Sequence, residues 1–109
     1  MSTSPDQAPV QPSTDARVLA PTPRVAVVFK AMPDGGVLFS TETELYFGLN
    51  HTGACIWEHL HPVCDTVDDV CAALDRAFPG GEAERVRRDV ERLLSVFVER
   101  KLADPRTPD

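Results

Sequence analysis

Apolar and polar residues follow one pattern in the first half of the chain and another in the second. Three short segments, at residues 24–30, 37–40 and 44–49, are rich in β-branched and aromatic residues and predict strands. Residues 32–36 contain Pro, Asp and two Gly, a composition typical of a turn. Because the connections between the strands are short, the pattern predicts an antiparallel meander.

After Asn50 the apolar residues recur at intervals of three and four, which predicts three helices. Asn50 is placed to cap the first helix, and Thr66–Asp69 resembles a capping box at the start of the second. Residues 79–81, Pro-Gly-Gly, end the second helix, and the third covers about residues 82–102. The order βββααα predicts an α+β fold of the winged-helix kind, with helices on one face of a three-stranded antiparallel sheet.

A length of 109 residues allows one domain, which we place at residues 21–104. Residues 1–20 are polar and Pro-rich and predict a disordered N-terminal tail, and residues 105–109 predict a short C-terminal tail. The N-terminus has neither the basic nor the apolar region of a signal peptide. The three Cys residues form no CxxC pair, which favours reduced thiols and a cytoplasmic protein.

The net charge is −6 and the pI about 4.9, which argues against general attraction to nucleic acid or to anionic lipid. Arg85, Arg88 and Arg92 nevertheless form a stripe on the third helix. Residues 82–101 hold six Lys or Arg against five Asp or Glu, so acidic residues interleave with the stripe. Three interpretations remain: a solvated flank, the recognition helix of a small DNA-binding regulator, or a basic wall facing the acidic side chains of a bound peptide. We expect no nucleic-acid or membrane partner.

A cluster of potential metal ligands spans the first two helices: Cys55, His59, His61, Cys64 and Cys71. Their spacings are irregular, whereas structural zinc sites show two tight ligand pairs. There is no nucleophile motif and no phosphate-binding glycine loop. The sequence therefore indicates a binding protein with no metal, no cofactor and no catalytic residue, and a Cys/His metal protein is a distant alternative.

The third predicted strand lies at an edge of the meander. Leu45, Phe47 and Leu49 point to one face, and Tyr46 and Gly48 to the other. An apolar edge with few charges can accept a peptide as an additional strand. The alternative is that a helix or a tail covers the edge.

The motif Tyr46-x-x-Leu49-Asn50-x-Thr52-Gly53 resembles the PqqD-like family of peptide-binding domains. These are also called RiPP recognition elements, after ribosomally made, post-translationally modified peptides. The resemblance covers residues 24–104 and includes Ile56-Trp57, Thr66–Val70, Leu74, Asp89-Val90, Leu93-Leu94 and Glu99–Leu102. It implies that the leader segment of a precursor peptide adds as a fourth antiparallel strand and fills a groove against the third helix.

The implied peptide contacts come from the third strand, the third helix and the helix rim. They are Leu45, Tyr46, Phe47, Gly48 and Leu49; Val86, Asp89, Val90, Leu93 and Phe97; and Arg85, Arg88 and Arg92.

The implied partners are a precursor leader peptide and a leader protease or modifying enzyme of the same pathway. The motif is most similar to members that serve lasso-peptide biosynthesis, where the domain hands the precursor to a leader protease. The alternative within the family is a peptide chaperone for a radical S-adenosylmethionine enzyme of pyrroloquinoline quinone synthesis. Residues 61–64 depart from relatives, which often have a short turn there.

Overall fold

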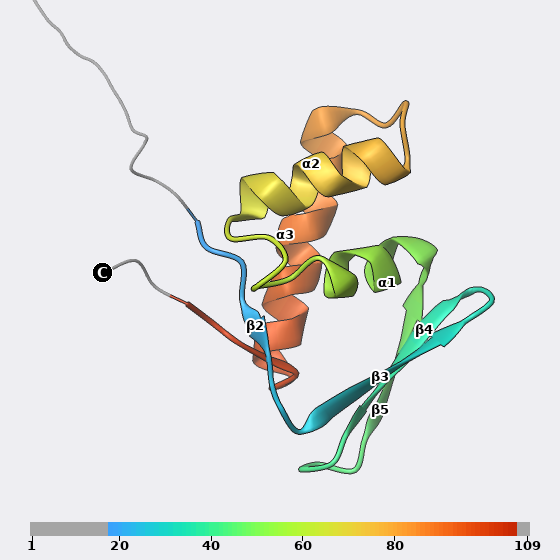
Figure 1. The fold of residues 1–109 in the computed structure, drawn as a ribbon, viewed down its shortest axis with the longest axis vertical. Helices are drawn as coiled ribbons and strands as arrows, with labels where there is room; N and C mark the ends of the chain where they lie inside the picture. The colour runs from blue at the N-terminus through green and yellow to red at the C-terminus, as the bar shows by residue number, and fades with distance from the viewer. Residues whose placement is uncertain (1–17, 107–109) are drawn as a thin grey trace, which may run out of the picture.

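The computed structural model describes residues 18–106, which form two small sheets and three helices (Figure 1). The elements in chain order are β2 (Thr22–Pro23), β3 (Val27–Met32), β4 (Gly35–Ser40), β5 (Tyr46–Asn50), α1 (His51–Glu58), α2 (Val67–Ala77), α3 (Ala83–Glu99) and β6 (Ala103–Asp104). Residues 1–17 of the predicted N-terminal tail and 107–109 of the predicted C-terminal tail lie outside the described residues.

The larger sheet is antiparallel with the order β3-β4-β5, and this confirms the predicted meander and the α+β fold. The register places Phe29, Leu38 and Phe47 in one row across the three strands. Figure 1 shows the helices on one side of the sheet, which projects beyond them. Since α1 contacts both β4 and β5, it is the helix that covers the inner face.

Gly35 and Gly36 belong to β4 and are buried, whereas the sequence analysis placed them in a turn. A Cβ atom on Gly35 would lie 2.1 Å from the carbonyl oxygen of Leu49. One on Gly36 would lie 2.4 Å from a ring atom of Phe29. The bare backbone lets these neighbours approach, and the turn is confined to Pro33-Asp34.

The helix caps confirm the sequence analysis. The Asn50 side chain accepts a hydrogen bond from the backbone N–H of Gly53 at 2.8 Å. Thr66 and Asp69 form a reciprocal capping box at the start of α2. The end of α3 differs from the expected residue 102, because Lys101 adopts a left-handed conformation with φ of 60°. This geometry terminates the helix in a Schellman motif.

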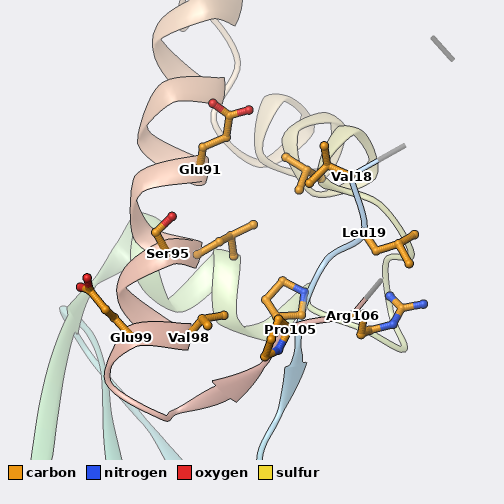
Figure 2. Close-up of a pocket in the computed structure, with 11 residues that line it drawn as sticks. Val18, Leu19, Glu91, Ser95, Val98, Glu99, Pro105 and Arg106 are labelled. Carbon is orange, nitrogen blue, oxygen red and sulfur yellow. The ribbon is translucent and has the colours of Figure 1, made fainter. Parts of the chain in front are cut away.

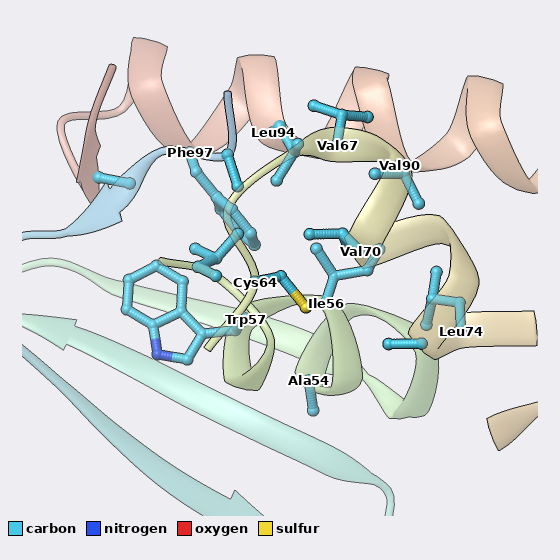
Figure 3. Packing of buried hydrophobic residues seen from close by; sticks show 14 of the residues in the cluster. Ala54, Ile56, Trp57, Cys64, Val67, Val70, Leu74, Val90, Leu94 and Phe97 are labelled. Atoms are coloured by element: carbon cyan, nitrogen blue, oxygen red, sulfur yellow. The ribbon is translucent and has the colours of Figure 1, made fainter. Parts of the chain in front are cut away.

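The core lies between the inner face of the sheet and the helices, and Figure 3 shows its helical part. Phe97 of α3 is fully buried and packs edge-on against Trp57 of α1, with ring centroids 5.2 Å apart. Val90, two helical turns earlier on α3, is also fully buried. The side of α3 that carries Val90, Leu94 and Phe97 is therefore committed to the core.

The chain segments at both ends pack on the helices, which corrects the predicted tails at residues 18–20 and 105–106. Ala20 is fully buried, and β2 pairs with β6. Arg106 donates hydrogen bonds to the backbone oxygens of Ala20, at 2.9 Å, and Asp65, at 3.1 Å. No local pattern predicts this packing, because two-residue strands have no measurable periodicity.

Candidate functional site

The outer edge of β5 is a row of exposed backbone groups. Among residues 18–106, β5 has β4 as its only strand neighbour. Ser40 donates its N–H to the carbonyl of Leu45 at 3.0 Å, one step beyond the Phe39–Tyr46 pair that ends the β4–β5 register. Because bonded directions alternate along an antiparallel strand, the N–H and C=O of Tyr46 and Gly48 face away from β4. These four groups could pair with an added strand.

A hollow of about 310 Å³ runs between this edge and α3. One wall comes from β5 and the start of α1, and the other from α3. The lining residues are Phe47, Gly48, Leu49, Asn50, Thr52, Gly53, Asp89, Arg92 and Leu93. We call this hollow the β5–α3 groove.

A second hollow of about 400 Å³ continues from the β5–α3 groove, since Thr52 and Asp89 line both. It extends over the end of α2 and the start of α3. Its other lining residues are Leu74, Phe78, Gly80, Gly81, Glu82, Arg85 and Val86. Phe78 is 43% exposed, so this extension offers an apolar surface to a ligand. The two hollows together form a continuous surface that starts at the free strand edge.

The local sequence explains how the groove forms. Asn50 is both the last residue of β5 and the cap of α1, so the chain turns sharply there. This turn places Thr52 and Gly53 beside the strand edge. On α3, Asp89 and Leu93 are four residues apart and share the face toward β5, beside the core face.

Phe47 is the groove residue with the most aromatic support. Its ring meets Phe97 edge-on at 6.3 Å, and the Arg100 guanidinium lies 5.8 Å from its centroid. Since Phe97 is itself held by Trp57, the groove floor is continuous with the core. The part of the groove that Phe47 forms is therefore held in place by core packing without a ligand.

Eight of the thirteen residues implied by the resemblance line the two hollows. They are Phe47, Gly48, Leu49, Asp89, Arg92 and Leu93 in the groove, and Arg85 and Val86 in its extension. Tyr46 and Leu45 are 73% and 68% exposed, and Leu45 precedes β5. Tyr46 can therefore meet a ligand through its backbone, although its side chain points to the other face of the sheet.

Three residues of the implied site lie elsewhere. Val90 and Phe97 are fully buried in the core, so they shape the groove from beneath without touching its contents. Arg88 lines a separate hollow on another face of α3, together with Glu84, Arg87 and Glu91. The spacing of three and four residues put Arg88 in one stripe with Arg85 and Arg92, but the helix turns it away from β5.

Eight lining residues were not among those implied: Asn50, Thr52, Gly53, Leu74, Phe78, Gly80, Gly81 and Glu82. The first three stand in the motif that carries the family resemblance. Asn50 caps α1 and Gly53 donates the capping hydrogen bond. These local roles do not indicate that both residues also line the groove.

The basic residues of α3 are partly neutralised. Arg87 is paired with Asp68 and Glu91, and its bond to Asp68 raises the pKa of the guanidinium. Arg92 lies 3.5 Å from Asp89. These pairs leave α3 less positive than its Arg count indicates, which disfavours the DNA-recognition interpretation.

The Cys and His residues do not converge. Cys55 Sγ lies 3.6 Å from His59 Nδ1, and the same nitrogen donates to the Cys55 carbonyl at 2.7 Å. Burial raises the pKa of the thiols of Cys55, Cys64 and Cys71, which disfavours the thiolate that metals bind. Within residues 18–106, no three His, Cys, Asp or Glu side chains are grouped to hold a metal ion.

A hollow of about 530 Å³ lies across α3 from the groove (Figure 2). It is bordered by Val18 and Leu19, by Ser95 and Val98 of α3, and by the segment that contains Arg106. We call it the termini cavity. It adjoins β2 and β6, which are only two residues long each, so it offers no strand edge as long as that of β5. None of the helices in the described part is long and apolar enough to cross a membrane.

The sequence model of the family described as coenzyme PQQ synthesis protein D (PqqD) matches residues 35–103. The chain belongs to the PqqD family. This PqqD-family chain is also similar in fold to two solved structures. One is described as TbiB1 in complex with the TbiA(beta) leader peptide, with a TM-score of 0.69 and 24% identity over 80% of this chain and 99% of that one.

The other is described as lasso peptide synthetase B1 complexed with the leader peptide. Its TM-score is 0.66, at 24% identity over 76% of this chain and 95% of that one. A comparison with curated protein sequences gives no match.

Proposed function

We propose that this PqqD-family chain binds the leader segment of a ribosomally made precursor peptide and presents it to a processing enzyme, without catalysing a reaction itself. The observation that carries the proposal is the open edge of β5, which borders a groove walled by α3. An extended peptide needs both features: backbone groups to pair with and a surface for alternate side chains.

The leader would pair with the outward backbone groups of Tyr46 and Gly48 as a fourth antiparallel strand. These bonds are independent of the peptide's side chains and contribute about 0.5–1.5 kcal/mol each. Alternate side chains would enter the groove and contact Leu49 and Leu93, which supplies the selectivity. The Asp89–Arg92 pair at the rim would favour polar leader residues between the apolar ones.

For the processing enzyme we propose a lasso-peptide leader protease. The support is the likeness in fold to the two lasso-peptide structures, each described with a leader peptide. By holding the leader, the domain would raise the local concentration of the cleavage site at an enzyme bound to it. Rate enhancement would come from this tethering alone.

A second pathway is favoured by one observation, the match to the PqqD sequence model, whose description names coenzyme PQQ synthesis. In that case the partner would be a radical S-adenosylmethionine enzyme. The genes beside this chain discriminate the two. A protease and an asparagine-synthetase-like enzyme support the lasso pathway, and a radical enzyme supports the alternative.

The test of leader binding is a fluorescence-anisotropy titration with the labelled leader of the precursor encoded beside this chain. We expect a micromolar or tighter Kd for the wild type and a large loss for Leu93→Asp, which puts a carboxylate on the groove wall. A scrambled leader of the same composition serves as the control peptide. Undiminished binding by Leu93→Asp, or equal binding of the scrambled peptide, would contradict the proposal.

A further inference from the structure

The outer face of the β3-β4-β5 sheet is apolar, and none of the helices within residues 18–106 covers it. The register aligns Val28, Phe39 and Tyr46 in one row across the strands. The Phe39 and Tyr46 rings are 4.7 Å apart, and Val28 and Tyr46 are 55% and 73% exposed. The next row holds Lys30, Val37 and Gly48. An exposed apolar surface of this kind commonly marks an interaction site.

We propose that this outer face docks the enzyme that processes the bound peptide. The inference rests on the proposed function, because it assigns the second partner of the same domain. The face is centred on the row Val28–Phe39–Tyr46, and the matching enzyme surface would be apolar with one acidic group opposite Lys30.

The size of the face argues for a transient enzyme contact over a stable dimer. Three strands about 4.8 Å apart, with side-chain rows about 6.8 Å apart, give a surface of roughly 300 Å². A stable protein–protein interface buries roughly 800 Å² per partner. The face is therefore too small to hold a stable homodimer together. Its size suits a transient contact with an enzyme that dissociates after it has processed the peptide.

Position makes this face continuous with the proposed peptide site. Tyr46 belongs to the row and also offers its outward backbone groups to the leader. A leader strand on β5 would widen the sheet by about 4.8 Å and add its own side chains to the same face. The docked enzyme would then contact domain and peptide together, so it would bind the loaded domain more tightly than the empty one.

Charge gives the contact its orientation. Lys30 is exposed in the second row, and among residues 18–106 it forms no ion pair. A single cation on an apolar face of a chain with net charge −6 would select a partner with a carboxylate at the matching place.

The test uses Val28→Asp, because Val28 lies on β3, two strands from the leader edge. Val63→Asp is the matched control, since Val63 is 66% exposed in the α1–α2 connection. The probes are the leader peptide and the leader protease, or modifying enzyme, encoded beside this chain. We expect Val28→Asp to keep the leader Kd within about twofold of wild type and to slow processing at limiting enzyme at least tenfold. Val63→Asp should change neither.

Processing by Val28→Asp at the rate of Val63→Asp overturns the inference. If thermal melting shows that Val28→Asp does not fold, Lys30→Glu replaces it, with an expected three- to fivefold slowing. Wild-type rates in that variant also overturn it. Sedimentation velocity supplies a further arm, since a wild-type dimer that Val28→Asp disperses assigns the face to a second copy.

Enzyme binding is also measured without peptide. If the wild type binds the enzyme and Val28→Asp does not, the docking face stands even where leader binding fails. If the leader binds and the enzyme does not, the proposed function stands and this inference falls.

Discussion

Helix α3 separates two hollows that differ in size and in what borders them. Toward β5 lies a groove of about 310 Å³ beside a strand with an open edge. Toward the ends of the described chain lies the termini cavity of about 530 Å³, beside two strands of only two residues each. The larger hollow is the weaker candidate for peptide binding, because an extended peptide needs hydrogen-bond partners for its backbone more than it needs volume.

The largest expected effect comes from placing the same charge on each side of α3. Leu93 lines the groove and Val98 lines the termini cavity, and both are half-buried. Leu93→Asp should weaken leader binding by about a hundredfold, since a buried carboxylate costs roughly 2–3 kcal/mol. Val98→Asp should stay within about threefold. The readout is the leader Kd, with circular dichroism as the check that each variant is folded. Equal losses of leader affinity in the two variants would contradict the placement of the peptide site on the β5 side of α3.

Gly36→Ala tests the close packing between the Phe29 ring of β3 and β4, the strand that pairs with β5. The added methyl would meet the Phe29 ring at 2.4 Å, so we expect a loss of about 1–3 kcal/mol in the free energy of unfolding. In a domain of this size that lowers Tm by about 5–15 °C. Gly48→Ala is the control, because a Cβ there meets nothing within 4 Å. A Tm for Gly36→Ala equal to that of Gly48→Ala would show that the Phe29 ring can move aside without penalty.

Gly48→Pro tests the open edge itself. Proline removes the N–H of residue 48, which faces away from β4, and proline is tolerated on an edge strand. The β4–β5 ladder should therefore survive, while leader binding falls about tenfold through the loss of one hydrogen bond. Gly48→Ala keeps the N–H and should bind like the wild type. Unchanged affinity in Gly48→Pro would place the leader off this edge.

The smallest effect concerns the ion pairs of Arg24, which join the segment before β3 to the β4–β5 connection and to β6. Arg24 donates hydrogen bonds to Glu42 and to Asp104, and this bonding lowers the pKa of the Glu42 carboxyl from its ordinary 4.5. A carboxylate whose pKa is lower in the folded state stabilises the fold at pH values above its unfolded pKa. This stabilisation is lost as the pH falls through the folded-state pKa. The Tm difference between wild type and Glu42→Gln should thus be largest near neutral pH and shrink below pH 4.5.

Because this contact is exposed, the difference should amount to a few degrees at most. Leader affinity at neutral pH should not change in Glu42→Gln. A constant Tm difference down to about pH 2.5 would mean that Glu42 contributes through something other than its charge.

The elements with strong local signals could be predicted from the sequence. Asn50 and the Thr66–Asp69 box mark helix starts, and their capping hydrogen bonds form as expected. The groove between strand and helix followed from the family motif together with alternation in residues 44–49. Such patterns predict structure because the interactions behind them join residues that are close in the sequence.

What the sequence could not show depends on contacts between distant residues. Arg106 reaches Ala20 across 86 positions, and no pattern near either residue announces it. Gly36 belongs to a strand because Phe29 needs its space, although Gly-Gly after Pro-Asp is typical of a turn. Val90 and Phe97 share the helix with Leu93, and only the packed core decides which of them face the groove.

Val18 and Arg106, the ends of the described chain, both border the termini cavity. The described chain therefore begins and ends on the side of α3 away from the β5 edge. A fluorophore or an affinity handle attached directly at Arg106 would therefore start on the side of α3 opposite the β5 edge. The length of a linker from Arg106 to a fused enzyme would then set the effective concentration of that enzyme at a peptide bound on β5.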